Sequence, residues 1–245
     1  WAEEFMAAHS NVSISVSGPG TGPGIAALID GTTDIAQASR PITQNETAQA
    51  EAKGVHPYEI HVANDGLAVV VNPSNNVSEL TTAQLSAIYT CGITNWREVG
   101  GKNAPIVVLS RDTNSGSHDF FLQLIVQMRG LPTENKALQY GPSVLFLPST
   151  EAGVTEVAQN PNAIFYAGLG YVTNQTKVVA IKKTAGDPAI LPSKETVLDG
   201  TYYLARPLFY YTSGEPTGLI KEFIDYCLSS AGQEKVSEVG YIPLA

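Results

Sequence analysis

Apolar and polar positions along this chain follow two periods in turn, one typical of strands and one typical of helices. Strict alternation over residues 12–17 predicts a strand, and apolar positions at helical spacing over residues 25–30 predict a helix. The same succession returns later, where the apolar, β-branched run 106–109 precedes a helical pattern over residues 119–128. Strands that alternate with helices predict an α/β fold.

The other elements continue this alternation, and no fixed-period repeat is visible. Further helices are predicted over residues 1–9, 43–53, 80–89, 150–159, 219–228 and 233–239. Further strands are predicted over residues 34–40, 163–166, 178–182 and 202–211. Residues 61–72 contain two strand-like pieces, and Asn64, Asp65 and Gly66 predict a turn between them.

Residues 110–121 lie at a predicted strand-to-helix junction and carry residue types that hold anions. The first turn of a helix has unpaired N–H groups and the positive end of the helix dipole. Ser115, Gly116 and Ser117 would supply N–H donors and two hydroxyls, and Arg111 adds a planar charged group suited to a tetrahedral oxyanion. An ordinary Ser-capped helix is the alternative.

Two further polar segments follow predicted strands. Residues 18–24 are rich in glycine and offer Thr21 and Gly22 as donors, but their prolines lack N–H groups that a dinucleotide pyrophosphate would need. A flexible surface turn is the alternative for this loop. The strand over residues 34–40 ends in Ser39 and Arg40 before Pro41. Three such loops predict a site that holds a ligand without changing it.

Composition restricts the partners of this 245-residue chain, of which 43% is apolar. This length allows one large core or two lobes. The net charge of −9 and the pI near 4.9 argue against nucleic acid and acidic membranes as partners. No apolar run approaches the ~18 residues of a membrane span, and the first residues do not form a signal peptide, so an exported protein would have lost its signal segment.

Catalytic and metal-binding patterns are weak. Ser117, His118 and Asp119 resemble a catalytic triad, but adjacent residues at a helix start project about 100° apart and cannot hydrogen-bond in series. Cys91 and Cys227 are predicted to be two buried free thiols, with one disulfide as the alternative, and no metal-ligand spacing is present. We therefore predict no catalytic residues, no metal and no cofactor.

Five segments resemble the phosphate-binding proteins that serve bacterial and archaeal phosphate ABC transporters. In the order of that family, they are residues 20–42, 93–101, 110–121, 166–172, and 232–236 with 240–244. The resemblance implies a periplasmic-binding-protein-like α/β fold with two lobes around a ligand cleft and two crossover strands. One implied lobe comprises residues 1–68 plus 205–245, and the other comprises residues 69–204.

The resemblance also implies the ligand-binding residues. They are Thr21 and Ser39 from the first lobe and Arg111, Ser115, Gly116 and Ser117 from the second. The chain departs from the family pattern in four ways. The usual first strand is missing, Ser39 stands where some members have Asp, Asn114 replaces a usual Gly, and Ser117 and His118 stand where Thr and Arg are common.

The function that the resemblance implies is high-affinity binding of inorganic phosphate in the interlobe cleft, for delivery to an ABC permease. An extracytoplasmic monomer that does not bind nucleic acid is expected, and a lipid anchor is left open. One alternative is another tetrahedral oxyanion, such as sulfate or molybdate, favoured by the missing carboxylate at Ser39. The others are a phosphate-releasing hydrolase and an adhesion or sensor protein on the same fold.

Overall fold

The protein consists of two compact units in a computed structural model that describes residues 1–18 and 20–244. Unit 1 comprises Trp1–Asn64, Asn114–Gly116 and Pro207–Ala245, and unit 2 comprises Asp65–Thr113 and Ser117–Arg206. The helices are α1 (Ala2–Ala8), α2 (Thr21–Ile29), α3 (Gln44–Ala52), α4 (Thr82–Tyr89), α5 (Gly116–Phe121), α6 (Thr150–Gln159), α7 (Lys194–Leu198), α8 (Gly218–Leu228) and α9 (Ser230–Glu238). The strands are β1 (Ala36–Ala38), β2 (Pro57–Val71), β3 (Glu79–Thr81), β4 (Val107–Arg111), β5 (Leu145–Leu147), β6 (Ala163–Gly168), β7 (Lys177–Lys182) and β8 (Ala205–Ser213).

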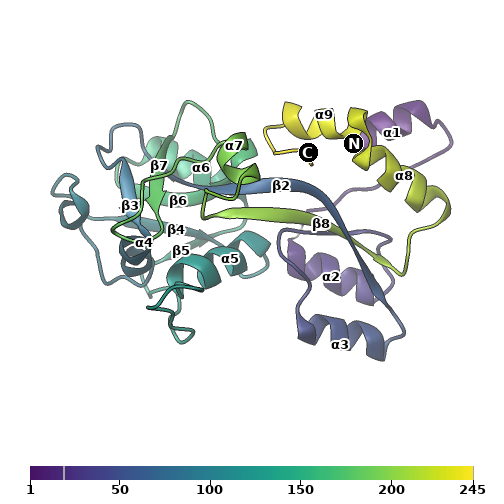
Figure 1. The fold of residues 1–245 in the computed structure, drawn as a ribbon, viewed down its shortest axis with the longest axis horizontal. Helices are drawn as coiled ribbons and strands as arrows, with labels where there is room; N and C mark the ends of the chain where they lie inside the picture. Colours follow the sequence, from purple (N-terminus) through teal and green to yellow (C-terminus); the bar gives the residue numbers. More distant parts are fainter. Residues whose placement is uncertain (19, 245) are drawn as a thin grey trace. The chain divides into compact units, whose positions relative to one another are not determined.

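Unit 1 is built around strand β8, which pairs antiparallel with β1. Alternate side chains of β8 enter two different cores, as the two-residue period of a strand requires. Phe209 and Tyr211 pack with Ile25 of α2, whereas Tyr210 packs with Phe5 of α1 and with residues of α8. Figure 1 shows α2 and α3 on one side of β8 and α1, α8 and α9 on the other. Helices therefore cover both faces of this strand.

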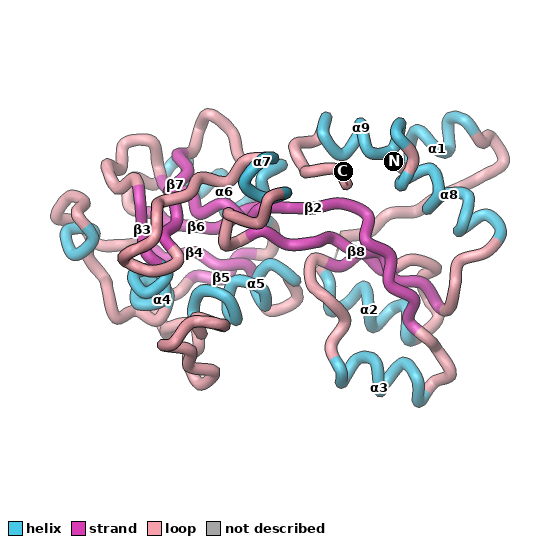
Figure 2. Tube along the Cα trace, viewed as in Figure 1, coloured by secondary structure: helices cyan, strands magenta, loops and turns pink. Residues whose placement is uncertain are grey.

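Unit 2 is built around the second half of β2, whose residues 67–71 are fully buried. This half lies between β6 and β7 and pairs antiparallel with both. Strand β4 continues the sheet parallel to β6, and β5 pairs parallel with β4. Figure 2 shows these strands in magenta. Helix α6 covers part of the sheet, since Val157 packs in the same core as Phe165 and Leu109. The parallel pairs place the carboxyl end of β4 beside that of β5.

The predicted α/β class is confirmed, and helices lie at every position where the sequence predicted one. Thr81 is the N-cap of α4, and α6 has the predicted bounds. The predicted helix over residues 119–128 begins earlier, at Gly116, and continues from Leu122 to Val126 as a π-helix. No helix in the described part of the chain has the length and apolar character that a bilayer-spanning segment needs. The predicted lobe limits at residues 68 and 205 stay a prediction.

Two strand predictions are wrong. Residues 12–17 form no strand. Val12 and Ile14 instead pack, partly buried, against the core around Phe5, and the N–H of Ile14 donates to the sulfur of Met6. The predicted turn at residues 64–66 is absent, because β2 runs through it without a break. The buried Asp65 carboxylate there pairs with Arg206, a distant partner that a local turn preference does not take into account.

Candidate anion-binding site

Two of the predicted strand-to-helix junctions meet in unit 1 through Thr21 and Ser39. Thr21 is the first residue of α2 and is only 3% exposed. Its Oγ1 accepts the backbone N–H of Ser39 at 3.1 Å. A hydroxyl that accepts a bond still carries its own hydrogen, so Thr21 can also donate to a ligand. The start of α2 adds N–H groups and the positive end of the helix dipole.

Two glycines bring the third junction against the first. Gly20 has a φ of 113°, and a Cβ there would lie 2.3 Å from the carbonyl oxygen of Asn114 and 3.4 Å from the backbone nitrogen of Ser115. A Cβ on Gly116 would lie 2.3 Å from Thr21 Oγ1 and 3.1 Å from the Cβ of Ser39. Only residues without a side chain allow this approach. Thr21, Ser39, Ser115 and Gly116 therefore gather in one part of unit 1.

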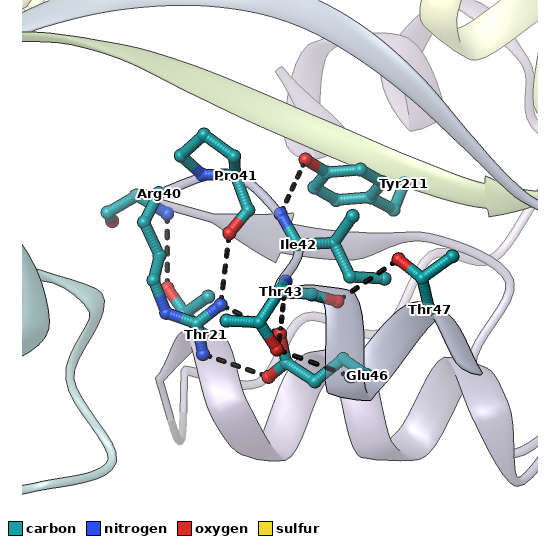
Figure 3. Close-up of polar contacts among 9 residues, drawn as sticks. Thr21, Arg40, Pro41, Ile42, Thr43, Glu46, Thr47 and Tyr211 are labelled. Carbon is teal, nitrogen blue, oxygen red and sulfur yellow. Dashed lines mark hydrogen bonds and ion pairs between the residues drawn. The ribbon is translucent and has the colours of Figure 1, made fainter. Parts of the chain in front are cut away.

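The segment after Ser39 is held in place by a network of polar contacts (Figure 3). The guanidinium of Arg40 forms two bonds with the carboxylate of Glu46, both of 2.9 Å. Thr43 and Glu46 form a capping box at the start of α3. The hydroxyl of Tyr211 accepts the N–H of Ile42 at 2.9 Å. This network fixes the backbone that carries Ser39 to Thr21.

The Arg40–Glu46 pair is expected to stabilise unit 1 less in acid than at neutral pH. Burial raises the pKa of Glu46, but hydrogen bonds from Arg40 and Thr43 outweigh that effect and leave this pKa below its ordinary value of 4.5. A group whose pKa is lowered by folding stabilises the fold above its ordinary pKa and loses that contribution as the pH falls. We expect Glu46→Gln to cost about 1 kcal/mol near neutral pH and progressively less below about pH 4.5.

Thermal unfolding of Glu46→Gln and the parent protein, measured across this pH range, checks the prediction. Glu51→Gln is the matched control, because Glu51 is exposed on the same helix. A stability difference that stays constant from neutral to acid pH would contradict the assignment.

Arg111 belongs to unit 2, and buried side chains fix its backbone. Its N–H donates to the hydroxyl of Tyr166 at 3.2 Å, and Tyr166 also bonds to the hydroxyl of Ser110 at 2.7 Å. The Arg111 carbonyl lies 2.9 Å from Nδ1 of His118. A carbonyl can only accept, so this ring nitrogen must carry a proton. Burial raises the pKa of Tyr166, so its phenol stays neutral at physiological pH.

The guanidinium of Arg111 lies at the start of α6. Its Nη1 donates to Oγ1 of Thr150 at 2.7 Å, and its Nη2 donates to the carbonyl of Pro148 at 3.1 Å. Nε is buried and has no hydrogen-bond partner among the described residues. Arg111 therefore retains donor capacity that the fold does not use.

The structure brings four of the six predicted ligand residues together in unit 1, whereas Arg111 and Ser117 lie in unit 2. Their role as ligands stays a prediction. Sequence reasoning missed the residues that hold Arg111, namely Thr150, Tyr166 and His118. The available signals were a hydroxyl at the start of a predicted helix and a tyrosine within a predicted buried strand, and neither indicates its partner.

Three other features singled out in the sequence can be located in the structure, namely the Ser117–Asp119 segment, the cysteines and the candidate metal ligands. His118 bonds to a backbone carbonyl rather than to Ser117 or Asp119. Cys91 and Cys227 are free thiols, although only Cys227 is buried and Cys91 is half-buried. Among the described residues, no cluster of three or more His, Cys, Asp or Glu side chains could hold a metal ion.

Two α/β units and hydroxyl-lined helix starts define the class of periplasmic-binding-protein-like solute receptors. The family sequence model that describes the PBP superfamily domain matches residues 1–231 of this chain. The chain is 35% identical to the protein SphX of Synechococcus elongatus. Their alignment, 256 positions long, covers 99% of this chain and 72% of SphX. The chain is 33% identical to the phosphate-binding protein PstS of Staphylococcus aureus, over 99% of this chain and 72% of PstS. The chain therefore belongs to the PBP superfamily, in the family of PstS and SphX.

Solved structures agree with this assignment. A crystal structure from Clostridium perfringens, described as a phosphate ABC transporter substrate-binding protein with bound phosphate, superposes with a TM-score of 0.82 and 31% identity. The superposition covers all of this chain and 93% of the Clostridium perfringens chain. An ABC-type phosphate transport receptor from Vibrio cholerae superposes with a TM-score of 0.77, also at 31% identity, over 99% of this chain and 93% of the other.

Proposed function

We propose that this protein binds inorganic phosphate for delivery to an ABC permease. The observation that carries the proposal is the packing of Gly116 against Thr21 and Ser39, because it gathers hydroxyls and helix-start N–H groups from segments far apart in the sequence. Such groups are suited to a tetrahedral oxyanion. The proposed ligand residues are Thr21, Ser39, Arg111, Ser115, Gly116 and Ser117.

The net charge of −9 opposes an anionic ligand at long range, so local donors have to hold it. Hydrogen bonds to a charged group contribute roughly 1.5–3 kcal/mol each. Several such bonds, with the guanidinium of Arg111, outweigh a repulsion that salt screens over about 8–10 Å. We propose an extracytoplasmic, monomeric carrier without enzymatic activity.

Isothermal titration of the parent protein tests the proposal. We expect one phosphate per chain and no loss of phosphate affinity in excess sulfate. Arg111→Ala should weaken phosphate binding by roughly 10- to 100-fold, the equivalent of one charge-assisted hydrogen bond. Absence of phosphate binding at millimolar concentration would refute the proposed function. Competition by sulfate would instead favour a general oxyanion carrier, which the hydroxyl of Ser39 in place of a carboxylate makes the second candidate.

A further inference from the structure

Thr150 bonds to the guanidinium of Arg111 through a hydroxyl that its own helix does not use as a cap. Ser149 is the N-cap of α6, and its side chain accepts the N–H of Ala152, so the cap is complete without Thr150. The hydroxyl of Thr150 is thereby available to Arg111, whose Nη1 it accepts at 2.7 Å. Thr150 is 9% exposed, and a β-branched side chain has few χ1 rotamers in a helix. The contact therefore has a defined geometry.

The position of the Arg111 guanidinium at the start of α6 is electrostatically unfavourable when no anion is bound. Thr150 is the first residue of α6, a helix of ten residues, and the start of a helix carries partial positive charge. A guanidinium there adds positive charge to positive charge, and the structure leaves its buried Nε without a partner among the described residues. A bound anion would relieve both costs. The arrangement thus fits a ligand contact better than a purely structural one.

The register of the sheet places Arg111 beside Pro148 and Thr150. Arg111 at the end of β4 lies opposite Leu147 at the end of β5, and Pro148 and Thr150 follow directly along the chain. The carbonyl of Pro148 accepts Nη2 while the hydroxyl of Thr150 accepts Nη1. These two contacts fix the plane of the guanidinium. Its other N–H donors are directed away from Pro148 and Thr150.

We propose that Thr150 is a positioning residue that orients Arg111 for the anion, an inference that rests on the proposed phosphate binding. Thr150 acts on the ligand through the guanidinium. Its hydroxyl therefore matters for phosphate affinity only while Arg111 is present. A residue of purely structural importance would lack this dependence.

Phosphate titration of Thr150→Val, alone and combined with Arg111→Ala, tests the inference. We expect Thr150→Val to weaken phosphate binding about tenfold in the parent protein and to have no further effect in Arg111→Ala. Thr150→Ser keeps the hydroxyl and should bind within about twofold of the parent. Where Arg111→Ala binds too weakly for calorimetry, equilibrium dialysis with radiolabelled phosphate supplies the affinities. Should Thr150→Val fail to fold, Thr150→Ala takes its place.

Thr82→Val is the matched control, because Thr82 is also buried, is the first residue of α4 and bonds through its hydroxyl to a carbonyl, that of Lys182. It should leave phosphate affinity unchanged. Unchanged affinity in Thr150→Val, or an equal loss with and without Arg111, would overturn the inference while phosphate binding stands. If the parent protein bound no phosphate, the proposed function would fail and the inference with it.

Discussion

Asp65→Asn is expected to destabilise unit 2 by about 3–5 kcal/mol, because it leaves the charge of Arg206 buried without its partner. The side chain of Asp65 is fully buried and that of Arg206 is 5% exposed. Oδ2 of Asp65 accepts Nη2 of Arg206 at 2.8 Å, and Oδ1 accepts the N–H of Leu169 at 3.1 Å. A lowering of the melting temperature by roughly 10 °C in calorimetry would match this cost.

Two further variants show whether the loss comes from the unpaired charge. Asp30→Asn removes a carboxylate whose ion pair with Lys53 is more than half exposed, and we expect it to cost less than about 1 kcal/mol. Replacing both partners, as Asp65→Leu with Arg206→Met, should recover much of the lost stability, since apolar residues need no compensation for desolvation. Equal melting temperatures for Asp65→Asn and Asp30→Asn would rule out this account of the pair.

The turn predicted within β2 is wrong, and this ion pair provides a physical reason. Asn, Asp and Gly in succession are strong turn formers when only neighbouring residues are considered. Here Asp65 pairs with a residue 141 positions away. A Cβ on Gly66 would lie 2.9 Å from Val197, so this glycine provides space for packing rather than a bend. Turn propensity is a local quantity and cannot register partners of this kind.

Over residues 12–17 the pattern predicted a strand that the structure does not contain. Their alternation has the two-residue period of a strand, but a strand also needs a neighbour with which to exchange backbone hydrogen bonds. Val12 and Ile14 pack on the core around Phe5 without forming a strand, whereas Val16 is 63% exposed. The alternation therefore predicted two of the three apolar contacts but not the backbone conformation.

In the candidate site, too, local features could be predicted from the sequence and distant contacts could not. Hydroxyls and glycines at helix starts could be recognised from the sequence, because capping and anion binding there depend on a few adjacent residues. Their convergence could not, since Gly116 and Thr21 touch across 95 positions of the chain. The family resemblance supplied that step. Thr150 and Tyr166 escaped notice because their importance lies in contacts with Arg111.

Gly116→Ala should nearly abolish phosphate binding. The added Cβ would lie 2.3 Å from Oγ1 of Thr21 and 3.1 Å from the Cβ of Ser39, so at least one of these groups must move. Losing two charge-assisted hydrogen bonds to the anion, at roughly 1.5–3 kcal/mol each, would weaken binding by about 100-fold or more. Overpacking costs typically 1–3 kcal/mol, which leaves the fold intact for titration at low temperature.

Gly22→Ala is the matched control for this substitution. Gly22 follows Thr21 directly in α2, and a Cβ there would meet no atom within 4 Å beyond its chain neighbours and the backbone of its own helix. The backbone N–H of residue 22 is kept, so phosphate affinity should change by less than about twofold, and alanine should favour the helix by up to about 1 kcal/mol. Titration and circular dichroism of both variants separate loss of the site from loss of the fold. If Gly116→Ala stayed folded and bound phosphate as well as Gly22→Ala did, the contact between Gly116 and Thr21 would have no part in the site, and the proposed ligand residues would have to be sought elsewhere.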